Sequence, residues 1–147
     1  MGFDLESDKG ATAQWTGVWW RLMLRIAEHY GWNAVGTQLP SAAEEKPWDG
    51  TYFTNDGQLV LSHDAFALAA SLRRALADPG LEDVANRIHE TSLLAGREET
   101  DRIFAALGLS DEDEDPPPPI ERILRQELEK PFEEMAQFCD AGAFRIL

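Results

Sequence analysis

The side chains best suited to metal chemistry are few and far apart in the sequence. The three histidines are His29, His63 and His89. A metal site needs ligands paired at short spacings, such as one turn of a helix. His89-Glu90 begins like a zinc-protease motif, but Leu93 stands where the second histidine belongs. The histidines therefore predict no metal site, and we expect no cofactor.

Three carboxylates alternate as they do in a calcium-binding loop: Asp111, Asp113 and Asp115. The sixth position of such a loop must be glycine, and the twelfth must be glutamate. Pro116 and Arg122 occupy those positions here. A solvated acidic run explains the pattern better, and the three aspartates become candidate contacts for a partner.

Residues suited to nucleophilic catalysis lack their usual surroundings. None of the serines stands in a nucleophile-elbow context, and there is no glycine-rich phosphate loop. Cys139 lies on the apolar face of a predicted helix, as a structural thiol does. The sequence therefore predicts a protein that is not an enzyme.

Aromatic residues are concentrated near the N-terminus. All five tryptophans and both tyrosines lie within the first 53 residues, and a shared aromatic core explains most of them. Trp20 lies off the main apolar stripe and Trp48 lies in a loop, so both are candidate contacts for a ligand or partner. Glu44, Glu45 and Asp49 accompany Trp48 and favour a cationic partner.

The charge balance separates the classes of partner. The chain has 147 residues, with 13 Lys and Arg against 27 Asp and Glu, and a net charge of −14. Nucleic acids and anionic membranes require basic clusters, so we expect neither as a direct partner. A basic protein fits better. The single cysteine, the absence of a secretion-like leader and the lack of a membrane-length apolar run predict a cytoplasmic protein. Its Arg-rich, Lys-poor composition is compatible with a bacterial source.

The clearest local structural signals lie between residues 51 and 76. Asn55-Asp56-Gly57 separates two short aromatic and branched runs, which predicts a β-hairpin over 51–61 with Phe53, Leu59 and Leu61 facing the core. Ser62 is then expected to cap a helix that runs to Ala77, with Asp64 in its first turn.

The remaining elements follow from apolar periodicity and from glycine and proline positions. The predicted fold class is α+β and mostly helical, with four to five helices and a small antiparallel sheet built on the 51–61 hairpin. The other expected elements are an N-terminal edge strand, helices over 12–30, 81–95, 98–107 and 120–139 (kinked or broken near 127–130 because of Pro131), and short strands over 34–38 and 144–147.

Composition divides the chain into three parts. Residues 1–109 form the predicted α+β core domain, and residues 110–119 form an acidic, proline-rich spacer. Residues 120–147 form a helix and a short strand. We expect this segment to dock on the core; the alternative is an arm that reaches a second chain.

Three functional hypotheses remain open. The leading one is a non-catalytic, acidic protein-binding module, such as an inhibitor, immunity protein or defence antagonist that acts on a basic partner. The second is a small-ligand-binding domain or unrecognised enzyme with a pocket of Trp and Tyr side chains (Trp15, Trp19, Trp32, Trp48 and Tyr52), in which His29 has a perturbed pKa. The third is a subunit of a homo-oligomer.

Overall fold

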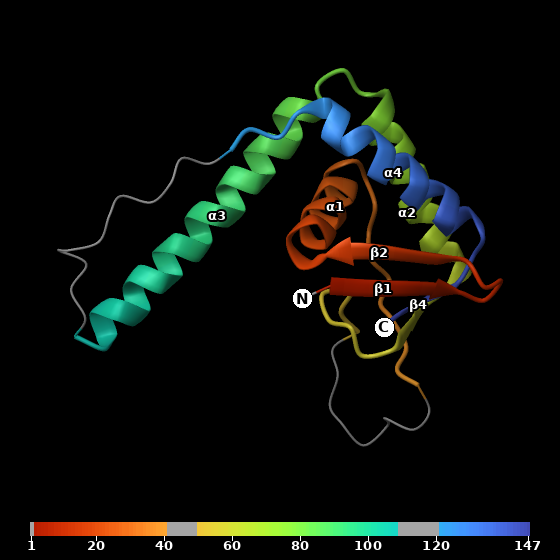
Figure 1. Ribbon diagram of the computed structural model, residues 1–147, viewed down its shortest axis with the longest axis horizontal. Coiled ribbons are helices and arrows are strands. Elements are labelled where there is room, and N and C mark those ends of the chain that lie inside the picture. Colours follow the sequence, from red (N-terminus) through yellow and green to blue (C-terminus); the bar gives the residue numbers. More distant parts are fainter. Residues whose placement is uncertain (1, 41–49, 109–120) are drawn as a thin grey trace.

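The computed structural model describes residues 2–40, 50–108 and 121–147, apart from the side chains of Thr100 and Phe104. Four helices and four strands lie in these ranges (Figure 1), which confirms the predicted mostly helical α+β class. In chain order they are β1 (Gly2–Ser7), β2 (Thr12–Thr16), α1 (Gly17–His29), β3 (Gln58–Val60), α2 (Ser62–Ala77), α3 (Leu81–Ala106), α4 (Arg125–Asp140) and β4 (Phe144–Ile146).

The sheet is antiparallel throughout, in the order β2-β1-β4-β3. The first and last strands of the chain are therefore neighbours at its centre, with Leu5 opposite Ile146. The C-terminal strand forms as predicted. The N-terminal strand forms too, but it is an inner strand and β2 occupies the edge.

One face of the sheet is apolar and carries the helices, while the other faces solvent. Alternation along each strand produces this division. Phe3 and Leu5 of β1 and Phe144 of β4 are buried, whereas Asp4 and Glu6 between them are exposed. The molecule thus has two layers, with α1, α2 and α4 on the same side of the sheet (Figure 1).

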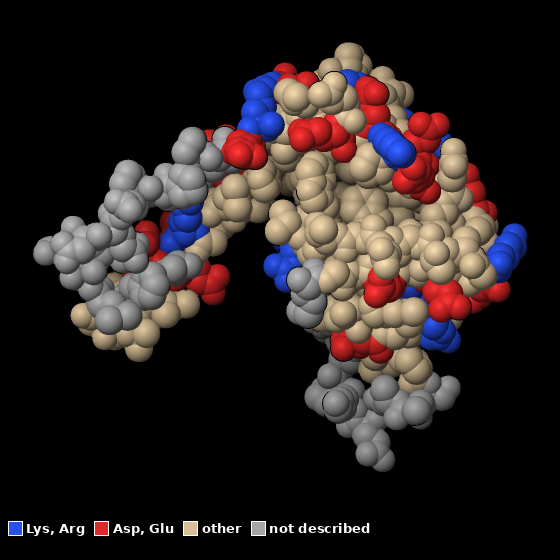
Figure 2. Space-filling view, in the orientation of Figure 1, with Lys and Arg blue, Asp and Glu red and all other residues tan. Residues whose placement is uncertain are grey.

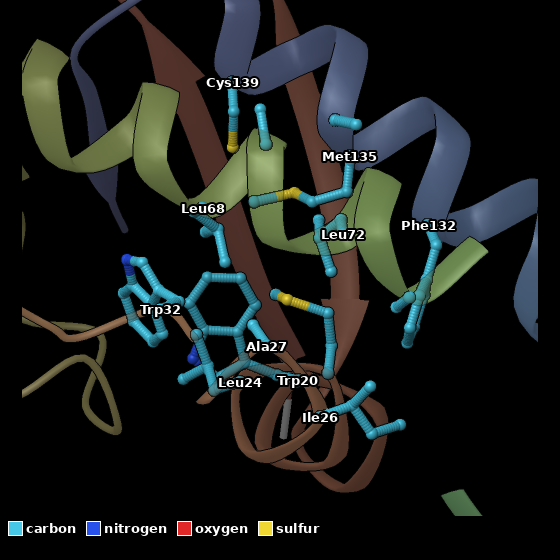
Figure 3. Close-up of a cluster of buried hydrophobic side chains, with 14 of the residues drawn as sticks. Trp20, Leu24, Ile26, Ala27, Trp32, Leu68, Leu72, Phe132, Met135 and Cys139 are labelled. Atoms are coloured by element: carbon cyan, nitrogen blue, oxygen red, sulfur yellow. The ribbon is translucent and has the colours of Figure 1, made fainter. Parts of the chain in front are cut away.

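The core lies where α1, α2 and α4 meet. Figure 3 shows Trp20 and Leu24 of α1 close to Leu68 and Leu72 of α2, with Met135 of α4 above them. The start of α4 lies beside the end of α2: Arg125 Nη1 donates to the carbonyl oxygen of Asp78 at 2.6 Å. The core therefore depends on the C-terminal segment as much as on the first helix.

The predicted hairpin over 51–61 does not form. Residues 51–57 contain no strand, and β3 pairs with β4 instead. The Gln58 side chain explains the difference, because its Nε2 donates to the carbonyl oxygens of Thr51 (3.1 Å) and Thr54. The carbonyls of Thr51 and Thr54 therefore accept hydrogen bonds from a side chain, whereas in a hairpin a neighbouring strand would supply the donors. Gly57 adopts the left-handed conformation (φ +75°).

The buried face of this segment is also the reverse of the predicted one. Tyr52, Gln58 and Val60 are buried, while Phe53 and Leu59 are only half-buried. The predicted face relied on the hairpin register, and β4 sets a different one. The expected strand over 34–38 is reduced to a single bridge between Gln38 and Leu59.

The first helix begins five residues later than predicted. Residues 12–16 form β2, and α1 starts at Gly17 with Thr16 as its N-cap, whose Oγ1 accepts a hydrogen bond from the Trp19 amide (3.4 Å). Pairing with β1 outweighs the helical spacing of Trp15 because it extends the sheet and packs the indole against the core. Gly31 follows the helix with φ +100°.

The other helices differ from prediction in extent and orientation. Ser62, the expected cap of α2, is instead its first residue, and the helix has no side-chain cap. Phe66 on this helix is 50% exposed. α3 continues through Gly96, where two helices were predicted. α4 continues through Pro131, so the chain does not break there. α4 packs against the core along its length, and this packing offsets the cost of Pro131 in its interior.

α3 extends away from the body of the molecule (Figure 1). Leu81 and Ala85 in its first turns are buried, but no residue of 86–108 with a described side chain is. Residues 121–124 run back beside those first turns, where the amide of Asn86 bonds both the N–H (2.7 Å) and the carbonyl (2.8 Å) of Ile123. The predicted spacer, 110–119, lies outside the described residues.

Candidate functional site

A groove of about 580 Å³ lies between β2 and α4. One wall is the whole of β2 and the other is one face of α4, while Trp19 of α1 lies at the end of β2. The lining residues are Thr12, Ala13, Gln14, Trp15, Thr16, Trp19, Glu127, Lys130, Pro131, Glu134, Met135 and Phe138. The two walls are distant in the sequence. Pairing with β1 places β2, and packing on the core places α4.

The apolar part of the groove rests on the core. Trp15 and Trp19 are half-buried, and the Trp15 ring contacts the edge of the Trp20 ring, with centroids 6.3 Å apart. Trp20 in turn stacks on Phe3, with centroids 5.5 Å apart. The exposed indole surface is therefore held by buried rings and presents a firm apolar platform.

Charged groups on α4 form the rim. The Glu127 carboxylate accepts a hydrogen bond from the Leu124 amide (2.8 Å), and Lys130 lies 4.0 Å from Glu134. Both members of the Lys130–Glu134 pair are largely exposed, so water screens the pair and it contributes little to stability. In Figure 2 an area without charged residues separates the acidic side chains over α4 from those over β1.

Pro131 lies within the α4 wall of the groove, and Glu127, one turn earlier, lines the groove as well. Proline has no N–H, so the usual helical bond to the Glu127 carbonyl is missing at this point.

Trp20, a predicted contact residue, is not on the surface. It is 0% exposed, and its indole Nε1 donates to the Tyr52 carbonyl oxygen at 2.7 Å. The expectation that it lies outside the core is wrong, because the stripe of α1 is wider than its main spacing suggests. The other candidate contacts lie outside the described residues: Glu44, Glu45, Trp48, Asp49, Asp111, Asp113 and Asp115.

The predicted aromatic pocket separates into two places. Trp15 and Trp19 line the groove, whereas Trp32 and Tyr52 are buried and pack edge to face, with centroids 5.2 Å apart. His29 is exposed at the end of α1. The α4 residues of the groove were not predicted. Their i, i+3/i+4 spacing from Glu127 to Phe138 was visible, but a spacing does not reveal which strand lies opposite.

Groups suited to catalysis are not gathered in the described ranges. Burial raises the pKa of the Cys139 thiol well above its usual range, and the thiol is wholly inside the core. The residues described hold no cluster of three His, Cys, Asp or Glu side chains that could bind a metal.

Comparison of the chain with protein-family models, curated proteins and solved structures finds no match. Within the described helices, none combines the length and the apolar character required to cross a membrane. Functional argument therefore rests on the geometry of the groove and on the charge of the chain.

Proposed function

We propose that this protein is a non-catalytic binding module whose β2–α4 groove takes a basic segment of a partner protein, as an inhibitor, immunity or defence-antagonist protein in a bacterial cytoplasm would. The observation that carries the proposal is the combination of an exposed indole platform with an acidic rim. Trp15 and Trp19 can hold an alkyl chain or guanidinium by apolar and cation–π contact. The carboxylates of Glu127 and Glu134 can accept hydrogen bonds from its charged end.

The charge of the whole chain supports a basic partner. A net charge of −14 attracts cations over distances comparable with the Debye length, and this raises the association rate at low salt. The same field repels anionic ligands such as nucleotides. Of the twelve residues that line the groove, only Lys130 is basic, and Glu134 offsets it.

The volume of the groove favours a second candidate, a small apolar ligand. About 580 Å³ lies within the range of small-molecule sites. Such a ligand would sit against Trp15 and Trp19 without need of the acidic rim. The two candidates therefore differ in whether neutralising the rim weakens binding.

Selection from a displayed library of random peptides tests the proposal. We expect the purified chain to enrich sequences with alternating or clustered Lys and Arg, and the isolated peptides to shift the amide signals of β2 and α4. Binding should weaken steeply as salt is raised. Enrichment of acidic or uncharged sequences, or shifts confined to other elements, would contradict it.

Two variants locate the site. Glu134→Lys reverses a rim charge and Trp19→Ala removes part of the platform, so each should reduce peptide affinity about tenfold, the effect of about 1.4 kcal/mol. Glu99→Lys makes the same charge change on the exposed part of α3 and should change affinity much less. If Glu134→Lys leaves affinity unchanged while Trp19→Ala abolishes it, the small-ligand candidate replaces the basic segment.

A further inference from the structure

β2 is an edge strand with one side open. It pairs with β1, and no other strand of the residues described adjoins it. An edge of this kind exposes backbone N–H and C=O groups that can bind another strand. The groove runs along β2 and includes every one of its residues.

The hydrogen-bond register shows which groups are available. In an antiparallel pair, alternate residues exchange hydrogen bonds with the neighbouring strand. The Ser7 amide donates to the Ala11 carbonyl (2.8 Å), so the pairs two and four residues further on, Leu5 with Ala13 and Phe3 with Trp15, also exchange bonds. The intervening residues of β2 direct their N–H and C=O groups away from β1.

Bonds on the other side of β1 agree with this assignment. Asp4 and Leu147 exchange hydrogen bonds (2.7 and 3.4 Å), so the even-numbered residues of β1 bond toward β4. The odd-numbered residues are left to bond β2. Thr12 and Gln14 therefore offer both backbone groups at the open edge, and Thr16 offers its N–H, because its carbonyl belongs to the start of α1.

Features that usually protect an edge are missing from β2. Protection comes from proline, a charged side chain or a bulge within the strand. Thr12–Thr16 reads TAQWT and contains no proline and no charge, and its register with β1 is uninterrupted. α4 contacts the strand but leaves the groove open.

We propose that an extended basic segment of a partner protein binds in the groove as a fifth strand, hydrogen-bonded to Thr12, Gln14 and Thr16. This inference rests on the proposed function and adds its binding mode. Alternate side chains of the segment enter the groove over Trp15 and Trp19, beneath α4. The others lie on the open face of the sheet, where Asp4 and Glu6 of β1 are exposed and long Lys or Arg side chains can approach them.

Charge decides between a partner and a second copy of this chain. Pairing two β2 strands would bring together two molecules that each carry −14, and it would place the acidic faces of both α4 helices at the same junction. A basic segment would instead be attracted electrostatically to the acidic groove. The groove therefore suits a cationic strand from a different protein.

The probe is an acetylated eight-residue peptide that alternates lysine and isoleucine. We compare it with two forms, one N-methylated on its isoleucine amides and the other on its lysine amides. A bound strand directs only one of these two sets toward β2. One methylated peptide should therefore bind about tenfold or more weakly than the other.

Residue-resolved amide exchange gives a second reading. The Gln14 amide should exchange rapidly in the free protein and become protected when the peptide binds, whereas Ala13 and Trp15 are protected in both states. Gln14→Pro removes the outward N–H and is tolerated at an edge, so it should weaken binding more than Gln14→Ala, which keeps that N–H.

The outcomes are distinguishable. If the peptide binds but the two methylated forms are equivalent and Gln14 stays unprotected, strand addition is wrong while the proposed function stands. If this peptide fails and library-selected basic peptides bind without protecting the Gln14 amide, strand addition is again wrong. If no basic peptide binds at low salt, both proposals fail. A dimeric mass with Gln14 protected before peptide is added would assign the edge to a second copy and overturn the inference.

Discussion

At the scale of single residues, Asp64 is the most unusual group in the core. It is 1% exposed, and it accepts hydrogen bonds from the Trp32 indole N–H (3.1 Å) and the Val35 amide (3.4 Å). Burial raises the pKa of this carboxyl above its ordinary value, and the two hydrogen bonds oppose the rise without cancelling it. The charged form is therefore less favourable in the folded state than in the unfolded state.

This shift predicts how stability depends on pH. The pKa of an aspartate in the unfolded state is near 3.9, and the pKa of Asp64 in the folded state is higher. Between these two values the folded state binds more protons than the unfolded state. The contribution of Asp64 to the free energy of unfolding is therefore lost as the pH rises through this window. Asp64→Asn removes that titration. We expect the unfolding free energy of the wild type, relative to Asp64→Asn, to fall as the pH is raised through this window in urea denaturation.

Trp32→Phe provides the matched comparison. It removes one donor to the carboxylate, so the decline with pH should become steeper than in the wild type. A wild type that gains stability over Asp64→Asn as pH rises would show instead that the hydrogen bonds outweigh burial.

The sequence identified Asp64 for a different reason. A carboxylate in the first turn of a helix is expected to interact with the helix dipole at the surface. Its burial depends on residues 32–35 lying over the start of α2, a contact between segments about 30 residues apart. Trp20 illustrates the same difficulty. A tryptophan can belong to the core or to a binding surface, and its hydrogen bond to Tyr52, 32 residues away in the sequence, places it in the core.

At the scale of elements, Arg125 joins two helices. It is the first residue of α4, and its guanidinium donates to the carbonyls of Leu76 and Asp78 at the end of α2, while Nε reaches Glu129 (3.0 Å). The last carbonyls of a helix lack intrahelical donors. One side chain thus completes α2 and fixes the start of α4.

We expect Arg125→Met to lower the unfolding free energy by about 1–3 kcal/mol, because it leaves two half-buried carbonyls without their charged donor. Arg125→Lys should recover only part of this loss, since a single ammonium does not reproduce the planar fork. Chemical denaturation measures both.

Arg102→Met is the control for this prediction. Arg102 lies 3.9 Å from Glu98 on the exposed part of α3, and its removal should change stability by less than about 0.5 kcal/mol. Equal effects at Arg125 and Arg102 would show that the link between α2 and α4 is unimportant.

Most helices and the last strand followed from the sequence, whereas the sheet did not. Apolar spacing placed α2, α3 and α4 approximately, because it reflects local geometry. The hairpin over 51–61 failed because strand partners are chosen across the chain, and β4 competes successfully for β3. The groove was missed for the same reason, since its walls, β2 and α4, are more than a hundred residues apart.

At the scale of the whole molecule, charge repulsion is the dominant electrostatic term. The chain carries 27 acids against 13 bases, and its ion pairs, such as Arg122 with Glu82 (3.1 Å), are mostly exposed. Exposed ion pairs contribute little to the free energy of unfolding. Repulsion among the excess carboxylates acts over the whole surface, and unfolding relieves it because the charges move apart.

Added salt should therefore stabilise the protein. Between about 0.01 M and about 0.1 M NaCl the Debye length falls from about 30 to about 10 Å. We expect Tm to rise by about 2–4 °C, the shift that about 1 kcal/mol produces in a domain of this size. Scanning calorimetry at several salt concentrations measures it, and a falling Tm would show that the ion pairs dominate.

The position of β4 between β1 and β3 has a consequence for how the molecule is made. During synthesis β1 and β3 leave the ribosome well before β4, and neither inner edge has its partner until residues 144–146 emerge. Contacts between such distant segments form slowly. The inner edges of β1 and β3 therefore stay unpaired until residues 144–146 are synthesised, and the four-stranded sheet depends on a contact between segments about 140 residues apart.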